Sequence, residues 1–265
     1  MIFLYEDDSF KRQIKRLEEI IASNIKKYKE SFSPIIISSY LIMKEISPIS
    51  PEVKKYFSTK KIFIREYEVF TTEINQELNK YIQNEIESYL GALNPNILNL
   101  LGISVSEIIE NIQQHAFSTK VVAICQNYRL KGIFDIVIYD NGIGFKKSLE
   151  NAGIKVKDDV EALLKVINEK VSSKKDKLRE RAYGLSQYFG LIYNYLHKKN
   201  NIVDAGIITN NAVFIVSEKK VYKMKGGVEG TLVFARVDLQ KIGEEEYINL
   251  DDVLYEEKVS YGGII

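Results

Sequence analysis

Between residues 107 and 116, a carboxylate, an amide and an imidazole side chain stand four residues apart from one another. Glu107, Asn111 and His115 follow one another at this interval, and isoleucines fill half of the positions between them. On a helix, this spacing places the carboxylate, the amide and the imidazole on one face and the isoleucines largely elsewhere. Such a face could orient a water molecule, bind a divalent cation through an amide oxygen and contact a phosphate. Taken alone, the pattern also fits an ordinary solvated helix face.

A second polar motif, Asp140 to Gly144, directly follows an apolar run that is typical of a strand. Gly142 and Gly144 lack a Cβ, so the backbone could pass close to a flat ligand. Asp140, at the end of the strand, could accept a hydrogen bond from an exocyclic amine. The alternative interpretation is an Asn-Gly hairpin turn.

Two further segments could bind phosphate or face a base. Residues 172–185 begin with a basic run that includes Lys174 and end with Gly184 and Leu185 at the entry to a predicted helix. The free N–H groups of a helix N-terminus favour a phosphate, although a solvated charge run with a capping glycine is equally consistent. Thr231 follows a glycine and opens an apolar run, so its hydroxyl could face a base; the alternative is an ordinary edge strand.

Apolar periodicity predicts the elements that must position these residues. The predicted helices cover residues 10–28, 74–90, 104–116 and 185–196. The predicted strands cover residues 34–37, 62–69, 120–126, 132–140, 202–209, 212–216 and 231–237. Residues 145–183 are charged and contain one helical stretch around residues 160–167, which is typical of a functional lid. The mixture of elements predicts an α/β protein.

Composition narrows the range of functions. The 265 residues are 45% apolar and 28% charged, with a net charge of +1, so a large core is expected and a nucleic-acid partner is not. The single cysteine excludes a disulfide or a cysteine-based metal cluster. No stretch approaches the roughly 18 apolar residues that span a bilayer, so we expect a cytoplasmic protein without a membrane partner.

The distribution of proline predicts the domain organisation. All four prolines lie in the first 95 residues, and proline disrupts both helix interiors and central strands. We therefore expect a small α/β module over residues 1–95 and a second domain over residues 96–240, with the helix predicted over residues 74–90 able to belong to either. Residues 241–265 carry seven acidic residues and two lysines and are expected to form a peripheral tail.

In their order along the chain, the four motifs resemble those of the Bergerat-fold (GHKL) ATPases, the superfamily of gyrase, the Hsp-type chaperones, histidine kinases and MutL. Residues 107–116 resemble the N box, residues 140–144 the G1 box, residues 182–185 the G2 box, and Gly230 with Thr231 the final Gly-Thr element. The resemblance covers about residues 98–239. It implies a two-layer α/β sandwich that binds ATP and Mg²⁺, here preceded by the N-terminal module.

The resemblance also implies a role for each matched residue. Asp140 would contact the adenine amino group, assisted by Thr231 through a shared water, and Gly142 and Gly144 would shape the adenine pocket. Asn111 would hold Mg²⁺, and Glu107 would be the general base. The residues that would contact or cover the phosphates are Gln114, His115, Lys174, Gly184 and Leu185.

Two functions remain open at this stage. The similarity is closest to the soluble anti-sigma-type kinases, which implies a Mg-dependent ATPase or a kinase that transfers the γ-phosphate to a hydroxyl of a partner protein. Alternatively, ATP is a conformational ligand whose γ-phosphate closes the lid, so that a surface binds a partner or a second copy, with slow hydrolysis as the reset. A self-phosphorylating histidine kinase is not expected, because the chain contains only two histidines and neither lies in a phosphoacceptor segment before the domain.

Overall fold

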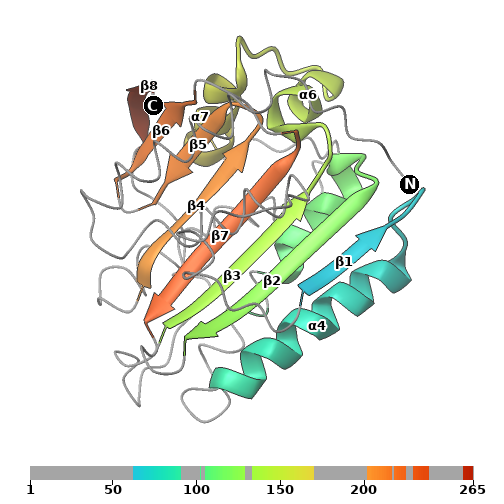
Figure 1. Cartoon of the computed structure of the whole chain (residues 1–265). Helices are drawn as coiled ribbons and strands as arrows, with labels where there is room; N and C mark the ends of the chain where they lie inside the picture. Colours follow the sequence, from blue (N-terminus) through green and yellow to red (C-terminus); the bar gives the residue numbers. More distant parts are fainter. Residues whose placement is uncertain are drawn as a thin grey trace, which may run out of the picture.

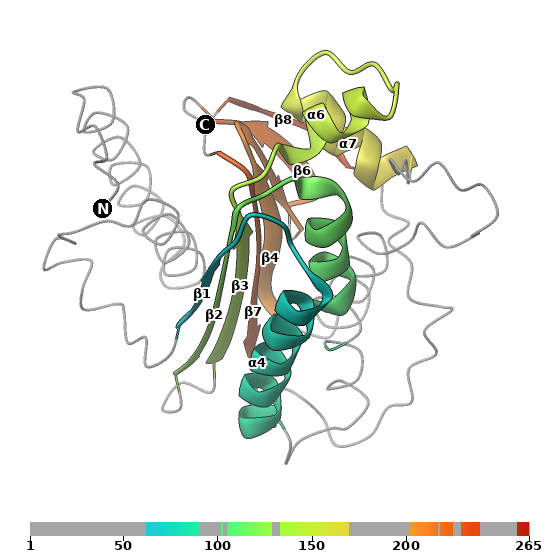
Figure 2. The ribbon, with the colours of Figure 1, turned by 90° about the vertical axis from the view of Figure 1, so that its right-hand side faces the viewer.

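The computed structural model describes residues 62–90, 102, 105–128, 133–169, 202–216, 218–224, 229–238 and 259–264. Within these ranges the chain forms one eight-stranded mixed β-sheet (Figure 1). The described helices cover one face of this sheet (Figure 2). The α/β class predicted from the sequence is therefore confirmed.

The strands lie in the order β1-β2-β3-β7-β4-β5-β6-β8 across the sheet. Their bounds are β1 (Ile62–Glu66), β2 (Lys120–Tyr128), β3 (Ile133–Asp140), β4 (Ile202–Thr209), β5 (Ala212–Ile215), β6 (Lys220–Lys223), β7 (Thr231–Asp238) and β8 (Ser260–Ile264). All neighbouring strands are antiparallel except β6 and β8, which are parallel. Because β7 lies between β3 and β4 and is antiparallel to both, its first residue lies beside the last residues of these two strands.

The structure confirms most of the helices that apolar periodicity predicts. α4 (Thr72–Leu90) matches the helix predicted over residues 74–90, and α7 (Asp159–Glu169) matches the stretch around residues 160–167. Residues 105–111 are α-helical and continue into a π-helical turn, η1 (Ile112–Ala116). The short helix α6 (Gly144–Asn151) begins inside the second polar motif.

Apolar side chains are buried on both faces of the sheet. Towards the helices, Leu78 and Ile82 of α4 pack with Ile109 and with Phe134 of β3, and each of these side chains is fully buried. Side chains alternate along a strand, so the neighbouring positions form a second buried cluster on the opposite face, centred on Val137 and other residues of the central strands. Burial on both faces explains why these strands read as near-continuous apolar runs.

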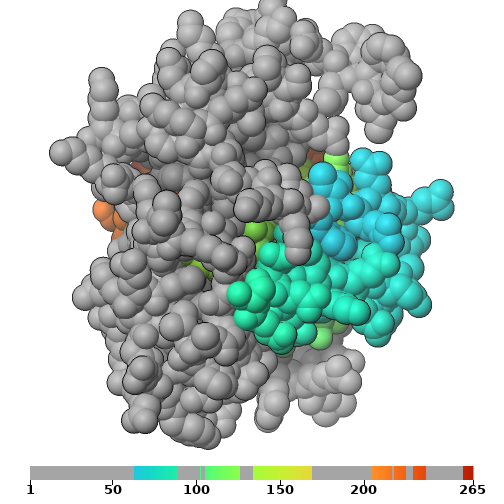
Figure 3. Space-filling model, turned by 60° about the horizontal axis from the view of Figure 1, so that its bottom comes forward, coloured from blue at the N-terminus to red at the C-terminus, as the bar shows by residue number. Residues whose placement is uncertain are grey.

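β1 and α4 belong to the same sheet and core as the strands that follow them. β1 pairs with β2 along all five of its residues. β1 and α4 lie together on one surface of the molecule, coloured cyan and teal in Figure 3. The boundary predicted near residue 95 therefore does not coincide with a break in packing for residues 62–90. The rest of the predicted module, residues 1–61, lies outside the described residues, as do the helix and strand predicted within it.

The C-terminal segment adds a strand that the sequence pattern does not predict. β8 pairs with β6 at the edge of the sheet, and Val259, which precedes it, is buried in the core. The side chain of Asn168 on α7 holds this segment in place: its Nδ2 donates to the Val259 carbonyl and its Oδ1 accepts from the Val259 N–H, both at 2.9 Å. Among the described residues, no helix is both long enough and apolar enough to cross a membrane.

Candidate functional site

Three polar residues lie in a row where β3 and β4 end and β7 begins. Asp140 is the register partner of Thr231, and Thr231 is also the register partner of Thr209. The hydroxyl oxygens of Thr209 and Thr231 are 3.3 Å apart, and Thr209 is fully buried. The sheet thus brings a carboxyl and two hydroxyls together from segments about 20 to 90 residues apart in the chain.

Asp140 is a buried carboxyl. It lies on the same sheet face as Ile138, the face covered by the helices, and only 4% of it is exposed. Its Oδ1 accepts a hydrogen bond from the Gly142 N–H at 2.9 Å. Burial raises the pKa of Asp140 to about 7, although the hydrogen bond from Gly142 opposes this shift. A buried carboxyl with a strongly raised pKa is a typical feature of a functional site.

Two glycines beside Asp140 leave no room for a side chain. A Cβ on Gly142 would lie 2.2 Å from the Ala116 carbonyl oxygen and 2.7 Å from Asp140 Oδ1. Gly230 has a φ of +91°, and a Cβ there would lie 1.9 Å from the Asp140 carbonyl oxygen. Both positions therefore require glycine, as expected where backbone segments approach each other closely.

Gly144, the other glycine of the motif, begins α6 next to the same strand ends. The N–H of the following residue, Phe145, donates a long hydrogen bond of 3.4 Å to Thr209 Oγ1. Asn210, just beyond β4, donates from Nδ2 to Asp159 Oδ1 at 2.9 Å, which connects the β4–β5 turn to the start of α7. The two helices that follow the motif are therefore anchored to the end of β4.

The helix that contains Glu107 separates polar and apolar residues as predicted. Glu107, Asn111 and His115 are half-buried and Gln114 is exposed, whereas Ile109 is fully buried in the core. The helix ends where its Ala116 carbonyl accepts a hydrogen bond from the Ile143 N–H at 2.8 Å. The end of this helix thus contacts the loop that follows Asp140.

A chain of polar side chains connects this helix to α4. Ser106 Oγ donates to Asn79 Oδ1 at 3.0 Å, and Asn79 Nδ2 donates to Asn75 Oδ1 at 2.7 Å. Asn75 Nδ2 then donates to Gln113 Oε1 at 2.8 Å. Partly buried hydrogen bonds of this kind restrict how one helix can rotate against another. Asn75 and Asn79 resemble ordinary polar positions of an amphipathic helix, so the sequence alone does not predict this connection.

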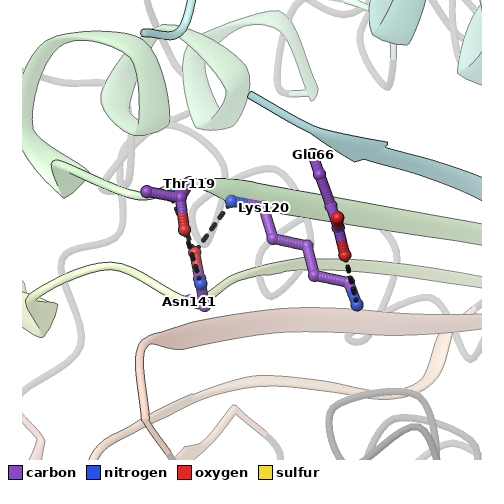
Figure 4. Close-up of polar contacts among 4 residues, drawn as sticks. All are labelled: Glu66, Thr119, Lys120 and Asn141. Carbon is purple, nitrogen blue, oxygen red and sulfur yellow. Dashed lines mark hydrogen bonds and ion pairs between the residues drawn. The ribbon is translucent and has the colours of Figure 1, made fainter. Parts of the chain in front are cut away.

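Asn141 connects the loop after β3 to the beginning of β2 (Figure 4). Its Oδ1 accepts hydrogen bonds from the N–H groups of Thr119 and Lys120, both at 2.9 Å, and its Nδ2 donates to Thr119 Oγ1 at 3.0 Å. Lys120 also forms an ion pair with Glu66 of β1, with 3.4 Å between Nζ and Oε1 (Figure 4). The sequence distinguishes Asn141 only as a member of the motif from Asp140 to Gly144, for which an Asn-Gly turn is the alternative interpretation.

Tyr67 approaches the same end of the sheet from the end of β1. Its N–H donates to the Thr119 carbonyl at 2.8 Å, and its hydroxyl is hydrogen-bonded to the buried Ser118 Oγ. The ring packs edge-on against Phe70, with 5.0 Å between the ring centroids. Burial raises the pKa of Tyr67 to about 12, the Ser118 hydrogen bond lowers it, and the negative charge of Asp140 raises it. Tyr67 is therefore neutral at physiological pH.

Mg²⁺ is compatible with the side chains at this site only if a ligand supplies most of its coordination. Among the described residues, no group of three or more His, Cys, Asp or Glu side chains could hold a metal ion. Asn111 offers one amide oxygen, and Mg²⁺ commonly binds through few protein ligands together with phosphates and waters. The amide therefore fits a magnesium ion that arrives with a nucleotide.

Four of the predicted site residues gather at the strand ends: Asp140, Gly142, Gly144 and Thr231. A second group, Glu107, Asn111, Gln114 and His115, lies on the helix that ends at the same loop. A third, Lys174, Gly184 and Leu185, lies outside the described residues. Thr209 is not predicted as a site residue, because nothing in the local sequence indicates that β4 lies beside β7. Comparison with known proteins found no relative: no family model matches the chain, and no curated protein matches it.

Proposed function

We propose that this protein binds ATP with Mg²⁺ and either hydrolyses it or transfers its γ-phosphate to a hydroxyl of a partner protein. The observation that carries the proposal is the buried carboxyl of Asp140. It lies beside the Thr231 hydroxyl and next to Gly142, where no side chain could be accommodated. A carboxylate and a hydroxyl that lie side by side at the end of the sheet suit the amine edge of adenine.

The arrangement of the elements supports a Bergerat-type sandwich as the fold of this proposal. A mixed sheet carries helices on one face, and Asp140 points towards that helical layer. The helix that carries Glu107 and Asn111 ends at the loop after Asp140. A nucleotide whose base contacts Asp140 would therefore have its phosphates within the same layer as this helix.

The chain's own residues would divide the chemistry between base recognition and phosphate transfer. Asp140 would accept the hydrogen bond of the adenine amine, and Asn111 would contribute its side-chain oxygen to the magnesium ion. Bound magnesium supplies charge neutralisation for the phosphates. Glu107 would accept the proton of the attacking water or hydroxyl, a role for which it must be ionised. The presence of a carboxylate and an amide on one helix face favours chemistry over a purely conformational role for ATP.

Thermal unfolding with and without ATP and Mg²⁺ tests the proposal. A ligand present at about one hundred times its Kd stabilises the folded state by about 2.7 kcal/mol, or roughly 5–10 °C in Tm for a chain of this size. Asp140→Asn should abolish this shift. Because the Gly142 N–H holds the side-chain oxygen, the amide NH₂ would face the adenine amine, donor against donor. Glu87→Gln, at an exposed position of α4, should keep the full shift. The absence of a shift in the parent protein, or a full shift in Asp140→Asn, would contradict nucleotide binding.

A further inference from the structure

Asn141 lies between the two halves of the proposed site, and the following inference rests on the proposed function. The base half centres on Asp140, whereas the phosphate half belongs to the helix that carries Glu107 and Asn111. We propose that Asn141 is a positioning residue that keeps this helix in one placement relative to Asp140. It would not touch the nucleotide itself.

The side chain of Asn141 uses both of its polar atoms on the segment that follows the helix. Its oxygen accepts two backbone N–H groups, those of Thr119 and Lys120, and its nitrogen donates to the Thr119 hydroxyl. All three hydrogen bonds are between 2.9 and 3.0 Å long. The two accepted N–H groups belong to consecutive residues where the chain enters β2, so the amide fixes the direction of the backbone there.

Backbone hydrogen bonds connect the same two segments without the Asn141 side chain. The Asn141 N–H donates to the Lys120 carbonyl at 3.3 Å, and the Ile143 N–H donates to the Ala116 carbonyl at 2.8 Å. From the other side, Tyr67 donates its N–H to the Thr119 carbonyl at 2.8 Å. Loss of the Asn141 side chain should therefore leave the fold intact but allow the helix end to shift.

A small shift matters because base and phosphate contacts come from different elements. A misplacement of about 1 Å between a reacting group and its partner can cost about a hundredfold in rate. Contacts to the base depend on Asp140, which the pairing with β7 and the Gly142 N–H hold without the Asn141 side chain, so they should change little. Contacts that involve magnesium depend on Asn111 and should weaken.

Calorimetric titration of the full chain separates these two effects. The probes are ADP without magnesium, and a non-hydrolysable ATP analogue with and without magnesium. In Asn141→Ala, the Kd for magnesium-free ADP should stay within about threefold of the parent value. The factor by which magnesium tightens binding of the analogue should fall about tenfold, and kcat for ATP hydrolysis should fall about 10- to 100-fold.

Two further variants and a control sharpen the test. Asn141→Asp keeps the oxygen that accepts both N–H groups, and the Thr119 hydroxyl can donate to the second oxygen, so it should retain most of the magnesium effect. Thr119→Val removes one hydrogen bond of the three at an exposed residue and should have an intermediate effect. Asn151→Ala, an exposed asparagine at the end of α6, should behave as the parent does.

The outcomes distinguish the inference from the proposed function. Equal weakening of magnesium-free ADP and of the magnesium-bound analogue in Asn141→Ala would mean that Asn141 only supports the fold. Unchanged binding and turnover in that variant would also overturn the positioning role, while the proposed function would stand. A parent protein that binds neither probe would overturn the proposed function and this inference together.

Discussion

Asp140 and Thr231 are directly opposite each other across β3 and β7, with the carboxyl buried and the threonine partly exposed. A ligand that reaches both must therefore approach from the side of Thr231. The hydroxyl can both donate and accept a hydrogen bond, whereas the ionised carboxyl can only accept. The pair thus favours a ligand edge on which a hydrogen-bond donor, facing the carboxyl, lies next to a donor or an acceptor that faces the hydroxyl.

Affinity for the base should depend on pH, because protonation of Asp140 removes the negative charge that strengthens the hydrogen bond from the adenine amine. With its pKa raised to about 7 by burial, this carboxyl gains a proton as the pH falls below that value. The affinity should then decrease by up to tenfold per pH unit. Adenosine has no phosphate to titrate, so its Kd between pH 6 and pH 8 provides the measurement. A constant Kd over this range would contradict the role of the carboxylate.

Without nucleotide, Asp140→Asn should be more stable than the parent protein at pH 8. The folded-state pKa of Asp140 is raised from 3.8 to about 7, so ionisation of the carboxyl destabilises the fold as the pH rises between these values. The amide avoids this cost, which reaches about 4 kcal/mol above pH 7. Near pH 4, where the carboxyl is protonated when folded, the difference should vanish. Thermal unfolding at both pH values tests the sign, and a less stable variant at pH 8 would contradict it.

Gly142→Ala should destabilise the protein and impair nucleotide binding. Its Cβ would lie 2.2 Å from the Ala116 carbonyl oxygen, so the loop and the helix end would have to move apart. Overpacking of this kind costs about 1–3 kcal/mol. Gly102→Ala is the matched control, since the nearest atom to its Cβ would be 4.0 Å away and the position is helical. Urea denaturation of both variants provides the comparison; equal midpoints would mean that the contact is not tight.

Glu107→Ala should separate nucleotide binding from turnover. A general base typically contributes about 10²- to 10⁴-fold to the rate and little to ground-state affinity. The variant should therefore bind a non-hydrolysable ATP analogue within a few-fold of the parent Kd and release phosphate at least about a hundredfold more slowly. Glu110→Ala changes an exposed carboxylate on the same helix and should hydrolyse ATP normally. Normal turnover in Glu107→Ala would leave ATP as a conformational ligand.

Replacing one member of the ion pair between Asp135 and Arg236 should be far more costly than replacing both. Both side chains are buried, and the guanidinium donates from Nε and a terminal nitrogen to the two carboxylate oxygens at 2.7 Å each. Arg236→Met would leave an uncompensated buried carboxylate, at a cost of about 3–5 kcal/mol. Adding Asp135→Val should recover most of this loss. The coupling is tested by the denaturation midpoints of the two single variants and the double variant. A stability loss in the double variant equal to the sum of the two single losses would contradict it.

The parts of the fold that depend on local pattern could be predicted from the sequence. The hairpin of β2 and β3 follows from two apolar runs separated by a short polar segment, and α4 follows from apolar residues at helical spacing. β6 and β8 were not predicted. Each is short, and β8 carries two glycines and pairs with a segment about 40 residues earlier in the chain.

The candidate site was predicted only as far as its residues lie in recognisable motifs. Asp140 and Gly142 follow a strand and are adjacent in sequence, so their proximity is a local property. The position of Thr209 beside Thr231 depends on β7 lying next to β4, and the local sequence does not predict this pairing. The contacts of Asn141 with Thr119 likewise depend on the pairing of β2 with β3.

The place of β7 in the sheet also determines how long the centre of the sheet remains unpaired during synthesis. β1, β2 and β3 can pair as soon as they leave the ribosome, but the inner edge of β3 has no partner until β7 follows about 90 residues later. At translation rates of about 5–20 residues per second, this edge waits roughly 5–20 s. An exposed, apolar strand edge is a template for pairing with other chains. The nascent protein should therefore depend on chaperones most strongly in the interval before Asp238 emerges.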